Sequence, residues 1–302
     1  MKRATFVASV LSLALATGAM AGCGGQQAAS TNEPAPAETT ANDTATNGTA
    51  AGQSQEETTA QFVAALAAVP ECKSVTVEEE MTTTNAKDGE KLSTKTVYKF
   101  DESGDTVKTS AEAEVLGVKL VYYTDGDDAV LVTDGPVYSG TTEQFDIAYA
   151  GGLGSYLGQI IGEEGTLVEC TAKIEKSEAE GMSFYSFTLD PEKYMASDEA
   201  LSMLKESGSP VKEAVITIGF DEDGSIASVD KKVVYEDITS VWNLVLSDHN
   251  KTTVDPMPEA TATYEEMQEA EQMKLDQVFG EGQSADADEN VTDVALNETA
   301  TE

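Results

Sequence analysis

The residue with the clearest covalent chemistry is Cys23, which follows two small residues, Ala21-Gly22. Before them lie the positive start Met1-Lys2-Arg3 and an apolar stretch at 5–19. A charged start, an apolar run and small residues are typical of a secretory signal, and a cysteine directly after them indicates a lipobox. We therefore predict cleavage after Gly22 and acylation of Cys23 by fatty acids such as palmitate. The alternative is simple secretion, with cleavage after Ala19-Met20-Ala21 and Cys23 left free.

The other two cysteines, Cys72 and Cys170, form an even pair in a chain that is expected to leave the reducing cytoplasm. Exported cysteines tend to be paired, so we predict a Cys72–Cys170 disulfide. It would close a loop of about 100 residues and stabilise the fold by roughly 4 to 5 kcal/mol in the simple entropy model. The alternative is two separate buried thiols, because small cysteines are common core residues.

Other catalytic or metal-binding groups are scarce. A Ser/His/Asp or Cys/His arrangement needs a histidine, and the single one, His249, stands in a polar turn at 247–250. Transition-metal clusters lack ligands for the same reason. The acidic turns at 125–128 and 221–224 lack the spacing of a calcium-binding EF-hand loop and are typical of hairpins. No spacing singles out a glycosidase carboxylate pair. We expect no catalytic residue, no metal and no cofactor, and therefore no enzyme.

The chain is strongly acidic, with 55 Asp and Glu against 18 Lys and Arg. Removal of Lys2 and Arg3 with the signal leaves 16 basic residues, so the mature net charge is −39. This charge repels nucleic acids and anionic head groups. Arg3 is the single arginine, so the mature chain has no guanidinium for bidentate recognition of phosphate. Nucleic-acid and nucleotide roles are therefore excluded, and the acidity favours solubility.

Composition divides the chain into five parts. Residues 1–22 are the signal peptide, and residues 23–58 are the acylated cysteine followed by an Ala/Thr-rich tether without large apolar side chains, which predicts disorder. Residues 59–258 have the size of one domain. Residues 259–280 contain a possible helix, and residues 281–302 resemble an acidic disordered tail. No later segment is long and apolar enough for a transmembrane helix.

Alternation of apolar and polar residues dominates the domain and predicts half-buried strands. Short turns rich in Gly and Asp separate them, which favours an antiparallel meander over parallel crossovers. The predicted strands are Ser74–Thr84, Thr94–Asp101, Val107–Val115, Lys119–Thr124, Ala129–Thr133, Pro136–Ser139, Val168–Glu175, Met182–Asp190, Lys212–Phe220, Ile226–Tyr235 and Val241–Ser247.

Helices are few. Helical spacing predicts Glu57–Val69, a long helix Glu143–Ile161 and a short one at Ser197–Glu206 with Ser197 as N-cap, and more weakly Tyr264–Phe279. About ten strands present a face of order 1,000 Å², and three short helices cover only about half of it. The sheet must curl or leave a cavity. We predict an α+β fold, with one long curved antiparallel meander, a half-barrel, and about three helices on its concave face.

The end of the domain resembles a known family. The hydrophobic segment 241–248 (VWNLVLSD) is followed by the exit HNKTTVDP at 249–256, which is similar to the exit of LolA-like half-barrel lipoproteins. The layout is most similar to the LppX/LprG type of lipid-carrying actinobacterial lipoproteins, although the chain has more acidic loops than that type. The resemblance implies a hydrophobic cavity that carries a lipid or lipoconjugate, such as a glycolipid, between membrane and wall, with a membrane transporter as partner. With the lipobox at Cys23, we expect a monomer anchored on the extracytoplasmic face of the cell membrane.

The residues that would line or close such a cavity come from the first helix and the long middle helix. Glycines at 151, 152, 154 and 158 interrupt the middle helix, and each costs up to about 1 kcal/mol against alanine. A weak apolar helix suits a mobile lid, and the alternative is core packing in which glycines permit close approach to the sheet. The residues predicted to line or close the cavity are Phe62, Leu66, Phe145, Tyr149, Leu153, Tyr156, Leu157, Ile160 and Ile161.

The rival function is a surface-interaction or stress-sensing module, in which the core is filled by the protein's own side chains.

Overall fold

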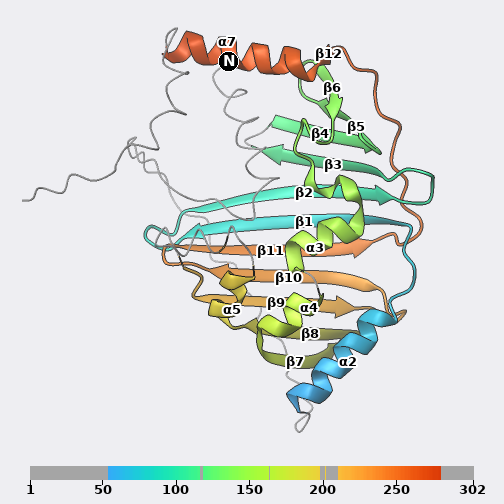
Figure 1. Ribbon diagram of the computed structural model, residues 1–302, viewed down its shortest axis with the longest axis vertical. Coiled ribbons are helices and arrows are strands. Elements are labelled where there is room, and N and C mark those ends of the chain that lie inside the picture. The colour runs from blue at the N-terminus through green and yellow to red at the C-terminus, as the bar shows by residue number, and fades with distance from the viewer. Residues whose placement is uncertain (1–53, 116–117, 163, 198–200, 202–209, 280–302) are drawn as a thin grey trace, which may run out of the picture.

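A computed structural model describes residues 54–115, 118–162, 164–197, 201 and 210–279 of the chain. The predicted signal peptide, Cys23, most of the tether and the acidic tail lie outside these residues. Within them, twelve strands form one open sheet in the order β12-β6-β5-β4-β3-β2-β1-β11-β10-β9-β8-β7 (Figure 1). The described part of the chain therefore has the α+β architecture with a single large sheet that the sequence predicts.

All strand pairs are antiparallel except the short pair of β12 with β6, which is parallel. Each predicted strand is present, with ends shifted by a few residues. The strands are β1 (Ser74–Asn85), β2 (Lys91–Asp101), β3 (Lys108–Val115), β4 (Val118–Asp125), β5 (Asp128–Val132), β6 (Val137–Thr141), β7 (Thr171–Ala179), β8 (Met182–Leu189), β9 (Glu213–Phe220), β10 (Ile226–Val234), β11 (Ile238–Ser247) and β12 (Ala262–Thr263).

The sheet consists of two sequential meanders, β1 to β6 and β7 to β11, which join where β1 pairs with β11. The register of this junction runs from Thr76 opposite Ser247 to Asn85 opposite Ile238. Within each meander the links are tight. The β7–β8 turn, Glu180-Gly181, has positive φ at both residues (53° and 82°), as the right-handed twist of a two-residue hairpin requires.

Alternate residues of the strands face one hydrophobic core. On the central strands these residues include Val75 and Val77 of β1 and Leu244 of β11, each at most 1% exposed. Because side chains alternate across a strand, the polar residues between them face the opposite side of the sheet. One face of the sheet is thus apolar across nearly its whole width.

Short helices lie on this face, and longer ones lie at its two edges (Figure 1). The 3-10 helix η1 (Ala148–Gly151) is followed by α3 (Leu153–Ile161), which lies over the central strands, whereas α4 (Glu164–Cys170) and α5 (Pro191–Ala196) lie over β8 to β10. Helix α2 (Gln55–Ala67) packs against β7, and α7 (Tyr264–Phe279) begins beside β6 at the other edge. Both ends of the sheet therefore have a helix beside the terminal strand, which limits edge-to-edge association.

The predicted long helix at 143–161 is wrong in its first half. Residues 142–146 form turns, η1 follows, and Gly152 (φ 93°) separates η1 from α3. This backbone conformation lies outside the helical region, and glycine adopts it without steric cost. The apolar residues across 145–161 do face the core, but they lie in a turn, in η1 and in α3 rather than in one helix.

The predicted strand at 168–175 begins later than expected. Residues up to Cys170 belong to α4, and β7 starts at Thr171. Leu167 and Cys170, spaced as one helical turn, are each 3% exposed, so the helical stripe decides the local structure. Further along, Ser197 is the C-cap of α5 rather than an N-cap, and most of the helix predicted at 197–206 lies outside the described residues.

Helix α5 was not predicted, although its signal stands in the sequence. Asp190 caps its first turn by accepting hydrogen bonds from the backbone amides of Glu192 and Lys193, at 2.9 and 3.2 Å, and Pro191 occupies the first turn. At the end of the chain, the predicted helix Tyr264–Phe279 is confirmed as α7.

Candidate ligand-binding site

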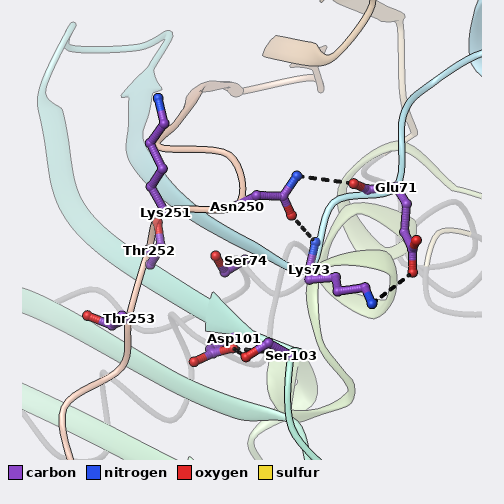
Figure 2. A pocket seen from close by; sticks show the side chains of 9 residues that line it. All are labelled: Glu71, Lys73, Ser74, Asp101, Ser103, Asn250, Lys251, Thr252 and Thr253. Atoms are coloured by element: carbon purple, nitrogen blue, oxygen red, sulfur yellow. Dashed lines mark hydrogen bonds and ion pairs between the residues drawn. The ribbon is translucent and has the colours of Figure 1, made fainter.

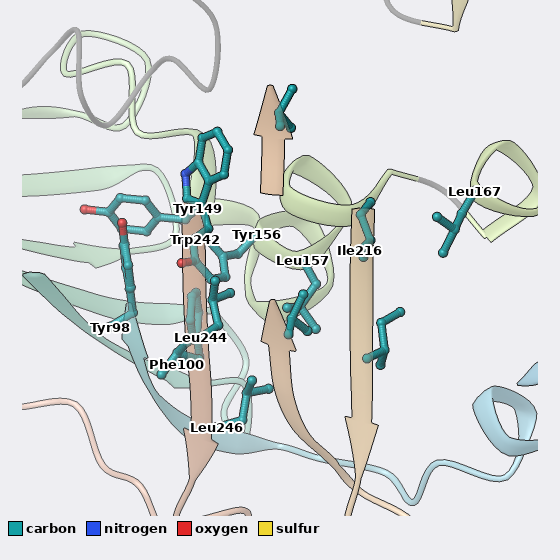
Figure 3. Close-up of a cluster of buried hydrophobic side chains, with 14 of the residues drawn as sticks. Tyr98, Phe100, Tyr149, Tyr156, Leu157, Leu167, Ile216, Trp242, Leu244 and Leu246 are labelled. Carbon is teal, nitrogen blue, oxygen red and sulfur yellow. The ribbon is translucent and has the colours of Figure 1, made fainter. Parts of the chain in front are cut away.

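The candidate site is the middle of the apolar face, below η1 and α3 (Figure 3). Its floor includes Trp242, Leu244 and Leu246, which alternate along β11 and are 6%, 0% and 5% exposed. On β9, Ile216 and Ile218 continue the same surface. The floor is therefore an extended hydrocarbon surface with the width of several strands.

Tyrosines from η1 and α3 meet aromatic residues of β2 on this floor. The ring of Tyr156 lies 4.6 Å from that of Tyr98 and 5.6 Å from that of Phe100, centroid to centroid. Tyr149 packs edge-on against Tyr98 at 5.1 Å (Figure 3). These predicted site residues are thus brought together as one aromatic group.

The remaining predicted site residues join the same core at other places. Phe62 of α2 packs against Tyr185 and Phe187 of β8, with the Phe187 ring 4.7 Å away. Phe145 packs against Tyr122 and Tyr264, near the opposite edge of the sheet. Leu157 is buried, and four others pack partly buried against the core: Leu66, Leu153, Ile160 and Ile161. The sequence does not indicate this separation into three aromatic groups.

Glu79 is a site residue that the sequence analysis missed. It follows Val75 and Val77 on the inward face of β1 and is surrounded by protein on most sides. The hydroxyl of Tyr156 donates a hydrogen bond to its Oε2 at 2.5 Å. Burial raises the pKa of the Glu79 carboxyl, and the bond from Tyr156 acts in the opposite direction but is the weaker effect. An acid at an inward position of an alternating strand is the signal that could have revealed it.

Charged side chains of the sheet hold both ends of α3. At its start, the backbone amide of Leu153 donates to Oε1 of Glu102 at 2.9 Å. At its end, the ammonium of Lys231 on β10 donates to the carbonyl of Ile160 at 2.8 Å and lies 5.3 Å from the Trp242 ring. An acid at the N-terminus and a base at the C-terminus both complement the helix dipole. Polar contacts therefore fix α3 over an apolar floor.

The glycines inside α3 are not required for packing. A methyl group added at Gly154 or Gly158 would meet no atom within 4 Å. Close approach of the helix to the sheet therefore does not explain these two residues. Gly152 differs, because its positive φ and the Glu102 carboxylate beside it leave no room for a side chain.

A polar pocket of about 520 Å³ opens at the rim of the sheet, where β1 begins and β2 and β11 end (Figure 2). Asn250 organises it. Its Oδ1 accepts the Lys73 amide at 2.7 Å, its Nδ2 donates to the Glu71 carbonyl at 3.2 Å, and its own amide donates to the Ser74 carbonyl at 2.7 Å. The pocket is lined by Glu71, Lys73, Ser74, Asp101, Ser103, Asn250, Lys251, Thr252 and Thr253.

His249 stands in the turn that leads to this pocket. Its Nε2 lies 3.1 Å from the carbonyl oxygen of Ile226, so one ring nitrogen is engaged with the backbone of β10. Residues on either side of it, Asp248 and Asn250, have positive φ (53° and 58°). The histidine therefore belongs to a tight turn after β11.

The predicted Cys72–Cys170 disulfide is wrong, because both residues are free thiols. Cys72 lies just before β1, and its Sγ lies 3.2 Å from the Ser74 carbonyl, whereas Cys170 is buried at the end of α4, just before β7. In the sheet, β1 and β7 are five strand positions apart. That is about 24 Å at the usual strand spacing, and a disulfide needs Cα atoms within about 7 Å.

The described residues contain no cluster of three His, Cys, Asp or Glu side chains arranged to hold a metal ion. The same residues include no helix of sufficient length and hydropathy to cross a membrane.

The chain matches no protein-family model and no curated protein sequence. Its structure is similar to that of LprF from Mycobacterium bovis, with 13% identity and a TM-score of 0.43 over 69% of this chain and 100% of that one. It is also similar to the lipoprotein LppX from Mycobacterium tuberculosis, with 13% identity and a TM-score of 0.39 over 67% and 99%.

A third similar structure is a LolA-superfamily protein from Nitrosomonas europaea, with 10% identity and a TM-score of 0.25 over 68% of this chain and 96% of that one.

Proposed function

We propose that this chain is an extracytoplasmic lipoprotein, anchored to the cell membrane through acylated Cys23, that carries a lipid with its acyl chains between the sheet and α3. The observation that carries this proposal is a helix weakened by glycines over an apolar floor, with no packing requirement for Gly154 and Gly158. Each glycine weakens the helix by up to about 1 kcal/mol against alanine, and displacement of the helix uncovers a hydrocarbon surface on which acyl chains gain free energy by leaving water.

The contacts of α3 support a lid that opens as a unit. Gly152 and Gly162, both at positive φ, flank the helix. Between them, polar contacts to Glu102, Glu79 and Lys231 join the helix to the sheet. Water hydrates the groups at Glu102 and Lys231 when the helix lifts, so the net cost of breaking these two contacts is small.

The test is to strengthen the lid without changing its apolar face. In the double variant G154A/G158A, each alanine stabilises the helix by up to about 1 kcal/mol and fits the space available. We expect the variant to be at least as stable as the wild type and to take up a pyrene-labelled phospholipid from vesicles several times more slowly. Stopped-flow fluorescence measures the rate.

Gly104→Ala is the matched control, because Gly104 lies in the β2–β3 turn and an added Cβ there comes no closer than 3.9 Å to its neighbours. This variant should take up lipid at the wild-type rate. If G154A/G158A loads as fast as the wild type, α3 is not the lid. If the wild type takes up neither this phospholipid nor a neutral diacylglycerol, the carrier proposal fails.

The anchor has its own test. Expression of the full precursor in a bacterium with lipoprotein processing should give an N-terminal peptide that starts at Cys23 and carries acyl mass, and Cys23→Ser should release the protein from the membrane fraction. Mass spectrometry that finds a free Cys23 thiol would establish simple secretion instead.

The packing of the interior favours one alternative, a surface-interaction module with a filled core. The side chains proposed to line the cavity touch one another, with ring centroids 4.6 Å apart for Tyr98–Tyr156 and 4.7 Å apart for Phe62–Phe187. Native mass spectrometry after expression in the source organism separates the two functions, because only a carrier co-purifies with lipid.

A further inference from the structure

The floor below α3 contains a carboxylate that hydrocarbon binding does not need, that of Glu79. Its carboxylate accepts the hydroxyl of Tyr156 at 2.5 Å among aromatic side chains. Glu79 is half-buried, and a carboxylate drawn partly out of water is costly unless a donor satisfies it, so removal of that donor leaves the carboxylate with an uncompensated part of its desolvation cost. Any ligand that lifts α3 also takes Tyr156 away, so it exposes this cost.

Tyr149 provides an independent observation beside the same group. It is 3% exposed, and its hydroxyl is buried with no hydrogen-bond partner among the described residues. Its ring packs at 5.1 Å from that of Tyr98, whose ring in turn contacts Tyr156. Buried hydroxyls are normally satisfied, so an unpartnered one marks a place where a polar group is missing.

We propose that Glu79 is the recognition point for a hydroxyl group of the lipid, and that Tyr156 occupies this point as an internal substitute while the site is closed. The inference rests on the proposed carrier function and specifies its ligand. The cargo is a lipid with a free hydroxyl near its acyl chains, as on a glycerol or a sugar.

Exchange explains how a hydroxyl is selected. When a lipid with a hydroxyl enters, Glu79 loses the bond from Tyr156 and gains one from the ligand, so the carboxylate remains satisfied. A lipid whose hydroxyl is blocked breaks the bond from Tyr156 to Glu79 and offers the carboxylate no donor in its place. A phosphate close to Glu79 meets a carboxylate of like charge and is disfavoured. The selectivity thus arises from the penalty on the wrong ligand as much as from attraction to the right one.

A matched ligand pair tests the proposal: 1,2-dioleoylglycerol, which has one free hydroxyl, and 1,2-dioleoyl-3-acetylglycerol, in which that hydroxyl is blocked. The protein is the mature chain with Cys23→Ser. Its single tryptophan, Trp242, lies on the floor and reports binding by its own fluorescence. We expect the wild type to prefer dioleoylglycerol by about tenfold or more, the size expected for a hydrogen bond to a charged group.

Two variants separate the contribution of the Glu79 carboxylate to the ligand preference from the contribution of the Tyr156 hydroxyl. Glu79→Leu removes the acceptor and should bring the preference to about one. Tyr156→Phe removes the internal substitute, so both ligands should bind several times more tightly while the preference for dioleoylglycerol stays. Thermal unfolding verifies that each variant folds, and Glu79→Gln, which keeps the shape and loses the charge, replaces Glu79→Leu if that variant does not fold; its preference should fall below that of the wild type.

Each remaining outcome is decisive. Equal affinity of the wild type for both ligands overturns the hydroxyl site and leaves the carrier function standing. A preference that survives in Glu79→Leu or Glu79→Gln places recognition elsewhere. Unchanged affinities in Tyr156→Phe overturn its role as a substitute. If the wild type binds neither ligand nor the phospholipid used above, the carrier function itself fails.

Discussion

Glu79 shows how one inward position can set a pH dependence. Burial raises the pKa of its carboxyl above the usual value near 4.5, so the folded protein holds this proton more tightly than the unfolded chain. Stability contributed by the protonated form is therefore fully present below the usual pKa and is lost as the pH rises through the raised one.

Glu79→Gln should remove this dependence. The amide oxygen still accepts the Tyr156 hydroxyl but buries no charge, so the variant should melt several degrees above the wild type at pH 7, and the difference should vanish below about pH 4. Differential scanning calorimetry between pH 4 and 8 measures both. A variant less stable than the wild type at pH 7 would contradict the assignment of burial as the dominant effect.

Asn250 is a structural residue at the polar pocket. It holds a positive φ of 58° and its side chain joins two backbone groups of the segment before β1. Asn250→Ala loses both hydrogen bonds and places a less suitable residue in the left-handed region, so we expect a loss of roughly 2 to 4 kcal/mol in urea unfolding.

Asn250→Gly separates the two causes, because glycine tolerates the positive φ and removes only the side-chain bonds. It should lose less stability than the alanine variant. Equal losses would mean that the hydrogen bonds alone fix this turn.

At the level of elements, the sequence predicts strands better than helices. The strand predictions are accurate because the alternation of apolar and polar residues repeats over several residues. Tight turns such as Asp125-Gly126-Asp127-Asp128 define where one strand ends and the next begins. Helix ends depend on single residues instead. One backbone angle at Gly152 breaks the predicted long helix, and one cap at Asp190 creates α5. Cys170 satisfies both a strand and a helix pattern, and its packing beside Leu167 decides between them.

Gly140 shows how closely β6, Phe145 and α7 approach. A Cβ at this residue would lie 2.8 Å from a ring carbon of Phe145 and 3.1 Å from Cβ of Tyr264. Gly140→Ala should therefore destabilise the protein by roughly 1 to 3 kcal/mol through overpacking. Gly104→Ala, with free space, is the control and should change stability little. A neutral Gly140→Ala would show that the start of α7 shifts easily.

For the whole molecule, the sequence predicts one large antiparallel sheet with helices on one face, and the structure confirms this sheet, which is built from two meanders. It does not predict that β1 pairs with β11, because a local pattern contains no information about a partner more than a hundred residues away. Prediction of the site from the sequence has the same limit. Tyr149 and Tyr156 could be named from helical spacing, but their contact with Tyr98 and Glu79 depends on how the finished sheet places β1 and β2.

Net charge should govern the response to salt. The full sequence carries −37, and most of the ion pairs found among the described residues, such as Lys119–Glu112 at 2.6 Å, are exposed and contribute little. Added salt screens the general repulsion more than it weakens such pairs. We expect the melting temperature to rise by several degrees between about 10 and 300 mM NaCl. A fall would show that local ion pairs dominate.

The junction between β1 and β11 also determines how the chain reaches its native state. Within each meander the contacting residues are near neighbours, whereas the junction includes a hydrogen bond between the Thr76 and Thr252 hydroxyls, 176 residues apart. Loop-closure entropy delays contacts of such high separation, and rates fall as contact order rises. The two meanders should therefore form early and dock late, so that refolding is slow at the docking step and its transition state is most sensitive to substitutions along β1 and β11.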